Sequence, residues 1–407
     1  MQSVQVLTAA WYGDREVNLA FPDGWDLNVL ALEKRPVLDG AQLRQAFHQP
    51  IGSPRISEMA QGKKSAVLIA DDLTRPTPTS EIIPFILEEL HAGGIAEEDI
   101  IIVMGFGCHR SMKRADLAKK LGEDTVRRFQ VKQNELDDPF IYLGETSRGI
   151  PVHINQWVMD RELKIGIGGA WPHENAAFSG GGKIVIPGVA GYETISCAHG
   201  TLEGGGNAGN VENDFRLNSE EAARMAGVNA TVLTTLNHRR QITGLFVGDV
   251  VAAHRAAAEE ARHAYAIKPM PNADIVIATG YPRDHDLSYS NIGAWPLHHS
   301  QPEATRILIA SADEGVCYHR FGIIHSRRHR EAENQERESR KALVRSADWD
   351  YILFSQAVGP MEVLETHPRA RLMESWDEIL DFLKQKYRDQ KPAVAIYPSA
   401  AIAYPRD

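Results

Sequence analysis

The chain has 407 residues, of which 43% are hydrophobic and 24% charged, so it is long and apolar enough for two or three packed domains. Its formal net charge of -10 argues against a general nucleic-acid binder, because such proteins carry a basic surface. No apolar run approaches the ~20 residues that cross a membrane, and no signal peptide is evident. The three cysteines are too few for a disulfide framework. We therefore expect a cytoplasmic protein that binds neither nucleic acid nor membrane.

Short apolar runs alternate with helical segments along most of the chain. The first 22 residues alternate apolar and polar side chains, which predicts a hairpin. Buried parallel strands are predicted at 65–70, 99–104, 163–168, 274–278, 306–310, 351–354 and 393–397. Helices are predicted from Thr79 or Ser80 to about Gly93, at 114–121, from Ser219 to about Met225, at about 249–267, and from Ser375 to about Tyr387.

A proline-marked linker at 268–272 separates the two sets of strands. This order predicts an α/β fold of two Rossmann-like domains, an N-terminal cofactor-binding domain at 1–268 and a C-terminal domain at 273–407. It leaves open whether about the last 15 residues pack back on the first domain. The active site is expected in the cleft between the two domains, where α/β proteins often bind ligands.

Polar side chains follow each of the first three predicted strands. The segment Asp71-Asp72-Leu73-Thr74-Arg75-Pro76 follows the first strand, His109 follows the second, and His173 follows the third. The carboxyl ends of parallel strands meet at one edge of a sheet, and α/β proteins bind ligands there. The three loops together therefore predict a shared site, although each alone is as well explained by solvent-exposed loop residues.

Lys183 lies between Gly180-Gly181-Gly182 and the apolar run at 184–186, which we expect to be a buried strand. The segment is not a phosphate-binding P-loop, because Ile184 stands where that motif needs Ser or Thr. Two roles stay open for the lysine: covalent attachment of a cofactor through its amine, or a solvated ammonium at the end of a buried stem.

Four separated segments resemble, in order, the nickel-pincer lactate racemase family. They are the loop at 71–76, Gly107-Cys108-His109-Arg110, Pro172-His173 followed by 178–183, and Ala198-His199-Gly200. The resemblance implies a nickel-pincer nucleotide joined covalently to Lys183, with His199 as the nickel ligand and with His109 and His173 as acid and base. It further implies cofactor contacts from Asp72, Thr74, Gly181 and Gly182, and substrate contacts from Arg75, Tyr289 and Trp295.

The activity that this resemblance implies is a racemase or epimerase. It would invert a hydroxyl-bearing carbon by reversible hydride transfer to the tethered cofactor, and it would depend on cofactor-making enzymes upstream. Lactate-active members carry a lysine at the position that aligns with Ile292. We therefore expect a substrate other than lactate: a larger 2-hydroxy acid, a sugar acid or a sugar. A homo-oligomer is left open.

Two alternatives belong to other classes. One is an oxidoreductase with a diffusing nicotinamide cofactor, which the absence of a strand-linked Gly-x-Gly-x-x-Gly fingerprint disfavours. The other is a non-catalytic nucleotide or metal binder, which the presence of His109, His173, His199 and Lys183 together disfavours. An absorbance test for NAD reduction would decide the first alternative, and covalent mass on Lys183 together with nickel would separate the racemase from the second.

Overall fold

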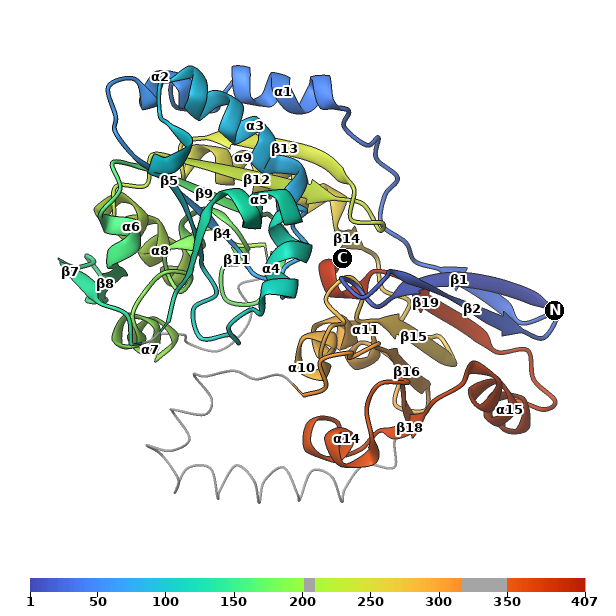
Figure 1. Cartoon of the computed structure of the whole chain (residues 1–407). Coiled ribbons are helices and arrows are strands. Elements are labelled where there is room, and N and C mark those ends of the chain that lie inside the picture. The colour runs from blue at the N-terminus through green and yellow to red at the C-terminus, as the bar shows by residue number, and fades with distance from the viewer. Residues whose placement is uncertain (136, 201–208, 317–349, 407) are drawn as a thin grey trace, which may run out of the picture. The chain divides into compact units, whose positions relative to one another are not determined.

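The computed structural model describes residues 1–135, 137–200, 209–316 and 350–406 (Figure 1). The chain forms two compact units. One unit spans Lys34–Ala264, and the other joins residues 1–33 to the described residues from 265 onward. Each unit contains a six-stranded sheet with helices, so the predicted α/β fold class is confirmed.

The sheet of the Lys34–Ala264 unit has the order β13-β12-β9-β4-β5-β6. Its strands are β4 (Ala66–Ala70), β5 (Ile100–Met104), β6 (Gln130–Gln133), β9 (Leu163–Gly169), β12 (Ala230–Leu236) and β13 (Ile242–Gly248). Neighbouring strands are parallel except β12 and β13. The chain moves outward from β4 to β6 and then returns to β9 on the other side of β4. The carboxyl ends of β4 and β9 therefore form the switch point at which such sheets bind ligands.

Helices cover this sheet on both faces (Figure 1). They are α1 (Gly40–His48), α2 (Ile56–Ala60), α3 (Thr79–Ala92), α4 (Arg114–Leu121), α5 (Glu123–Arg128), α6 (Gln156–Met159), α7 (Tyr192–Gly200), α8 (Asp214–Met225) and α9 (Ala252–Ala264). A hairpin of β7 (Phe140–Glu145) and β8 (Pro151–Asn155) lies outside the main sheet. Side chains alternate between faces along a strand, so Val67 and Ile69 of β4 share one core with Ile184 and Phe215.

The other unit has an all-parallel sheet of order β18-β17-β16-β15-β19-β3. Its strands are β15 (Ile275–Thr279), β16 (Thr305–Ile309), β17 (Tyr351–Phe354), β18 (Arg371–Met373), β19 (Ala393–Tyr397) and β3 (Asp26–Val29). Its helices include α10 (Leu287–Ser290), α11 (Trp295–His298), α14 (Pro360–Thr366) and α15 (Trp376–Lys386). The hydroxyl of Ser375 accepts a hydrogen bond from the backbone N–H of Glu378, which caps the start of α15.

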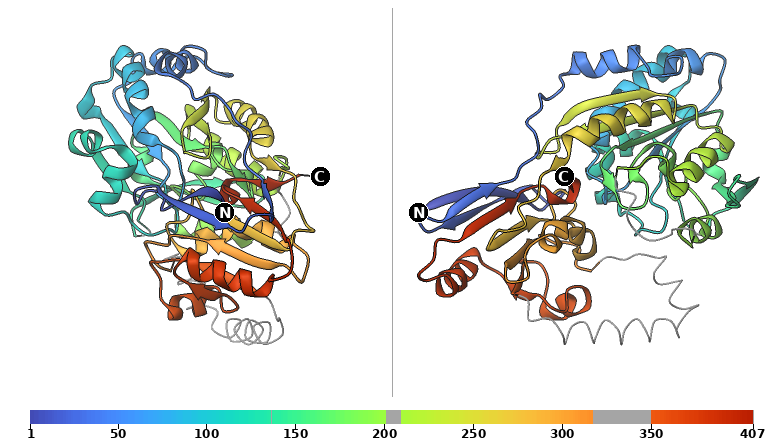
Figure 2. Two further views of the ribbon diagram at one scale, coloured as in Figure 1. Left: turned by 90° about the vertical axis from the view of Figure 1, so that its right-hand side faces the viewer. Right: turned by 180° about the vertical axis from the view of Figure 1, so that it is seen from behind.

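The N-terminal segment departs from the predicted domain at 1–268, because it belongs to the unit that the C-terminal half builds. The predicted hairpin forms from β1 (Gln2–Thr8) and β2 (Arg15–Phe21), and β3 then adds to the sheet beside β19. Both views in Figure 2 show these blue strands next to the red C-terminal strand. The closing tail forms β20 (Tyr404–Pro405), which pairs with β14 (Ala266–Ile267) of the same unit.

The predicted strand at 184–186 is wrong. The chain instead forms a short 3-10 helix, η2 (Gly181–Ile184), and then a turn, although Ile184 and Val185 are buried as expected. The glycines before Lys183 turn the chain sharply, so the apolar run packs under the sheet without joining it. Across the described residues no helix has the length and apolar character to pass through a membrane.

Candidate active site

A buried ion pair anchors the loop that follows β4. An Asp71 carboxylate oxygen lies 2.6 Å from the Lys120 ammonium on α4, and the other accepts from the Thr77 hydroxyl at 2.5 Å. Lys120 also donates to the carbonyl of Arg75 at 3.0 Å. Burial raises the pKa of Asp71 and lowers the pKa of Lys120, because a charge is costly away from water. The pair and its hydrogen bonds hold the loop at 71–77 against α4.

Asp72 and His109 form a second polar pair, above the ends of β4 and β5. Asp72 Oδ2 lies 2.5 Å from His109 Nδ1, and Oδ1 accepts from the backbone N–H of Thr74 at 2.9 Å. Burial alone would raise the pKa of Asp72, but the charge and hydrogen bond of His109 outweigh it, with help from Arg75 and Thr74, and lower the pKa below its usual value. Asp72 is therefore a carboxylate that accepts the Nδ1 proton of His109, so whenever the ring is neutral its lone pair is on Nε2.

Three glycines form the turn that presents Lys183. Gly180 and Gly181 have φ of +76° and +59°, in the left-handed region that favours glycine. A Cβ on Gly181 would lie 2.9 Å from the Cβ of His254, and one on Gly182 would lie 2.5 Å from the carbonyl oxygen of Ser219. The turn therefore leaves no room for a side chain before Lys183, which is itself 9% exposed.

Lys183 and His199 lie against the same aromatic ring. The Lys183 ammonium is 4.8 Å from the centre of the Phe215 ring, and the His199 ring meets Phe215 edge-on at 5.7 Å. His199 Nδ1 donates to the carbonyl of Ile195 at 2.7 Å, so its lone pair is on Nε2. Burial lowers the pKa of His199 more than this bond raises it, and the charges of Lys183 and His109 lower it further. His199 is thus held neutral, as a metal ligand must be.

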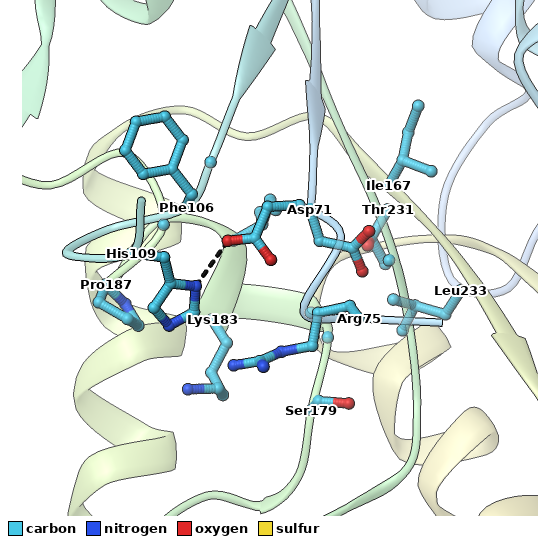
Figure 3. A pocket seen from close by; sticks show the side chains of 17 residues that line it. Asp71, Arg75, Phe106, His109, Ile167, Ser179, Lys183, Pro187, Thr231 and Leu233 are labelled. Carbon is cyan, nitrogen blue, oxygen red and sulfur yellow. Dashed lines mark hydrogen bonds and ion pairs between the residues drawn. The ribbon is translucent and has the colours of Figure 1, made fainter. Parts of the chain in front are cut away.

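One pocket gathers most of these groups (Figure 3). Its empty space, counted out to the solvent at its mouth, is about 510 Å³. Arg75, His109 and Lys183 point toward one another in it. The wall also includes Asp71, Asp72, Phe106, Ile167, Ser179, Gly181, Thr231 and Leu233. Thr74 links two residues of this wall, because its hydroxyl accepts a hydrogen bond from the Arg75 guanidinium at 2.9 Å and donates one to the Asp72 carboxylate.

Two of the predicted histidines are not among the residues that line this pocket. His199 packs edge-on against the Phe215 ring that also faces the Lys183 ammonium. His173 belongs to β10 (Pro172–His173), which pairs with β11 (Ala177–Phe178) in the hairpin before the glycine turn. The backbone N–H of Asn175 donates to His173 Nδ1 at 3.2 Å, so the neutral ring carries its proton on Nε2.

The predicted substrate residues Tyr289 and Trp295 lie in the other unit, in segments that follow β15. Tyr289 stacks on His285 at 5.3 Å. The Trp295 indole donates to the carbonyl of Ala400 at 2.9 Å and packs edge-on against Tyr397. Ile292, at the position where a lysine is expected, is 39% exposed.

Arg216 and His254 support the site, and the sequence does not single them out. Arg216 on α8 is fully buried and donates to three backbone carbonyls of the segment at 176–180. Its pKa is lowered by burial to about 10, so it stays charged at neutral pH. His254 on α9 donates from Nε2 to the carbonyl of Ser179 at 3.1 Å. Both residues occur on charged helices, where a solvent-exposed side chain is the ordinary expectation.

Among the residues that the structure describes, no group of three or more His, Cys, Asp or Glu side chains is placed to hold a metal ion. The groups beside the pocket that suit a metal-bearing cofactor are the neutral imidazole of His199 and the amine of Lys183. An imidazole can ligate a metal, and an amine can attach a group covalently.

The family model for the lactate racemase N-terminal domain matches residues 12–209. Lactate racemase from Lactiplantibacillus plantarum is 31% identical over 282 residues, a match that covers 67% of this chain and 66% of that protein. Lactate racemase from Thermoanaerobacterium thermosaccharolyticum is 29% identical over 257 residues, covering 61% of this chain and 60% of that protein. The chain thus spans slightly under two thirds of the lengths of these relatives.

Two solved structures share the fold. The lactate racemase apoprotein from T. thermosaccharolyticum matches with a TM-score of 0.75 and 20% identity, over 99% of this chain and 100% of that one. A protein from Thermotoga maritima matches with a TM-score of 0.63 and 17% identity, over 92% and 100%. The sequence matches and the shared fold together confirm the resemblance carried by the four motifs, and the chain belongs to the lactate racemase family.

Proposed function

We propose that this protein is an isomerase, a racemase or epimerase that inverts a hydroxyl-bearing carbon. The observation that carries the proposal is the convergence on one pocket of the Asp72–His109 pair, Arg75 and Lys183, with His199 against the same Phe215 ring as the lysine. Relatives named lactate racemase support the same reaction class.

The residues beside the pocket fit a nickel-pincer nucleotide. The tight glycine turn fixes the backbone that carries Lys183, whose amine would attach the cofactor, and His199 would supply an imidazole to the nickel. Asp72, Thr74 and Gly181 would contact the cofactor, and Gly182 would shape the turn. When bound, the cofactor would supply a hydride acceptor beside the substrate carbon.

The chain's own residues would hold and move the protons. His109 has its lone pair on Nε2, so it can take the proton of the substrate hydroxyl, while Asp72 stabilises the ring once it is charged. His173 presents Nε2 with its proton and would serve the opposite face of the substrate. Arg75 is a planar cation in the pocket wall, suited to a substrate carboxylate or hydroxyl oxygen.

We propose a substrate other than lactate, with Tyr289 and Trp295 among the residues that contact it. A lysine that would pair with the small lactate carboxylate is replaced by Ile292. Larger 2-hydroxy acids, sugar acids and sugars have further hydroxyl groups for recognition and depend less on that one charge. Fast interconversion of D- and L-lactate by the cofactor-loaded protein would contradict this specificity.

The test is to express the chain beside the enzymes that make the cofactor, and then to measure intact mass, nickel content and stereochemical inversion. We expect added mass on Lys183, about one nickel per adduct, and inversion of one or more hydroxy acids or sugars on a chiral column. Lys183→Ala should lose the added mass, and His199→Ala should keep the mass but lose nickel.

The outcomes separate the alternatives. If the wild-type protein gains no added mass, the result favours a non-catalytic nucleotide or metal binder. Substrate-dependent reduction of NAD without adduct would identify an oxidoreductase instead. Added mass and nickel without inversion of any compound in a broad panel would contradict the racemase activity while keeping the cofactor.

A further inference from the structure

A buried arginine holds the segment of chain that leads to Lys183. Arg216 donates to the carbonyl of Gly180 at 2.9 Å, to that of Ala176 at 3.4 Å and to that of Phe178. The guanidinium has no exposed surface, and the carboxylate of Glu220 lies 3.9 Å from its Nε. Its principal hydrogen-bond partners are therefore backbone carbonyls two residues apart along one strip of chain.

These carbonyls lie where the backbone is irregular. Ala177 has φ of +61°, and Gly180 and Gly181 are also in the left-handed region, so this strip does not continue as a sheet. A buried carbonyl without a donor is costly, and a planar fork of five N–H groups can serve several carbonyls from one side. A lysine has three N–H donors on a single atom, so it cannot spread them over carbonyls spaced along a strip as the fork does.

Two neighbouring contacts act on the same strip. His254 donates to the carbonyl of Ser179, between the groups that Arg216 holds. Phe215, the residue before Arg216 on α8, presents its ring to the Lys183 ammonium. Helix α8 thus contacts both the backbone before Lys183 and the end of its side chain.

We propose that Arg216 is a positioning residue that fixes the place and the accessibility of the Lys183 amine. The proposal rests on the proposed function only in taking that amine as the point of cofactor attachment. With the carbonyls of 176, 178 and 180 held, the turn stays closed, Lys183 stays buried and its amine stays beside the Phe215 ring. Without the fork, the strip loosens and the amine leaves that position more often.

The test is trace acetylation of the cofactor-free protein, with each lysine read by peptide mass spectrometry. Arg216→Lys keeps the charge and removes the fork. Lys164 is the internal reference, because it lies in the same unit and is 8% exposed, close to the 9% of Lys183. We expect the rate at Lys183 relative to Lys164 to rise roughly tenfold in Arg216→Lys. The fraction of chains with the Lys183 adduct should fall after expression beside the cofactor-making enzymes.

Arg306→Lys is the matched control. Arg306 is 3% exposed and also donates to backbone carbonyls, those of Leu297, Gln301, Pro302 and Ala304, but in the other unit. The Arg306→Lys variant should lower the melting temperature as Arg216→Lys does. It should leave the ratio of the acetylation rates of Lys183 and Lys164 unchanged. If Arg216→Lys does not fold, His254→Leu, which removes the donor to Ser179, is measured in the same way.

An unchanged ratio in Arg216→Lys, or equal rises at Lys183 and Lys164, overturns the proposal. A raised ratio supports it even when wild-type protein gains no adduct, and that combination contradicts cofactor attachment rather than positioning. If Arg216→Lys has both a normal level of the Lys183 adduct and an unchanged ratio of acetylation rates, the role of Arg216 is contradicted. The proposed function is then left intact.

Discussion

Hydrogen bonds and burial decide which histidine nitrogens of this site carry protons. His109 is set by Asp72, 37 residues earlier, and His199 by the carbonyl of its own helix and by burial. Asp72 and His109 follow two neighbouring buried strands, and this position predicts from the sequence that they lie close together. Lys183 is singled out by the family motif. Arg216 was not predictable, since its partners are backbone carbonyls that carry no sequence signal.

Asp72→Asn should lower kcat by about 10²- to 10⁴-fold and change KM much less. The amide cannot stabilise a charged His109 ring, and it can favour the wrong tautomer by donating to Nδ1. The measurement is the rate of stereochemical inversion under saturating substrate, with nickel content and Lys183 mass as controls that should match wild type. A kcat within twofold of wild type would remove Asp72 from the acid–base pair.

Helices and strands hold the site residues in place through close packing of the backbone. The glycine turn is the clearest case, because it lies between α8, α9 and β9 and its backbone approaches each closely. Sequence patterns predicted the strands at 163–168 and 393–397 and the helix at 114–121 almost to the residue. They missed β12 and β13, and they gave η2 as a strand, because an apolar run alone does not reveal whether a turn will keep it out of the sheet.

Gly182→Ala should destabilise the protein by about 1–3 kcal/mol, because its Cβ would lie 2.5 Å from the backbone oxygen of Ser219. Gly40→Ala is the matched control. Gly40 is in the first turn of α1, with no atom within 4 Å of the added Cβ, and the change should be neutral or slightly stabilising. Urea unfolding of the two variants measures the difference. Equal stabilities would show that the turn moves away from α8 at little cost.

The two structural units do not follow the order of the sequence, because residues 1–33 belong to the same unit as the described residues from 265 onward. The predicted boundary near 268 is close to the point where the second unit resumes, but no local signal shows that β3 pairs with β19, more than 360 residues later. Asp284, which is fully buried, fastens this segment. It accepts from the Thr8 hydroxyl at 2.7 Å and from the backbone N–H groups of Ala9 and Ala10 at 2.7 and 3.0 Å.

Asp284→Ala should lower the free energy of unfolding by about 2–4 kcal/mol, since three buried donors lose their acceptor. Limited proteolysis should then cut the segment before β3 sooner. Asp313→Ala is the control. It removes an ion pair to Arg15, which belongs to the same N-terminal segment and whose side chain is 49% exposed. That change should stay within about 1 kcal/mol. Similar losses from both variants would contradict the role of Asp284.

Buried histidines should make the whole protein sensitive to mild acid. Burial lowers the pKa of His367 to about 4, and it also lowers the pKa values of His199 and His254. In the unfolded chain His367 takes up a proton near pH 6.5, whereas in the folded protein it does so only near pH 4. The neutral ring therefore contributes its full stabilisation above pH 6.5, and this stabilisation is lost as the pH falls toward 4. The share is roughly 3 kcal/mol. Urea unfolding from pH 7 to pH 4 should show a smaller loss in His367→Gln; an identical slope would contradict the prediction.

The interleaved division of the chain bears on how it is made. During synthesis Lys34–Ala264 emerges as a continuous stretch and can close its own sheet, while β3 has no partner until β19, which ends at residue 397, has been made. At ~5–20 residues per second, that wait lasts for most of translation. The ribosome therefore presents an assembled lysine-bearing unit preceded by a hairpin whose core side chains, Val6, Leu19 and Phe21, are still uncovered. A holdase that binds exposed apolar side chains has a natural target there.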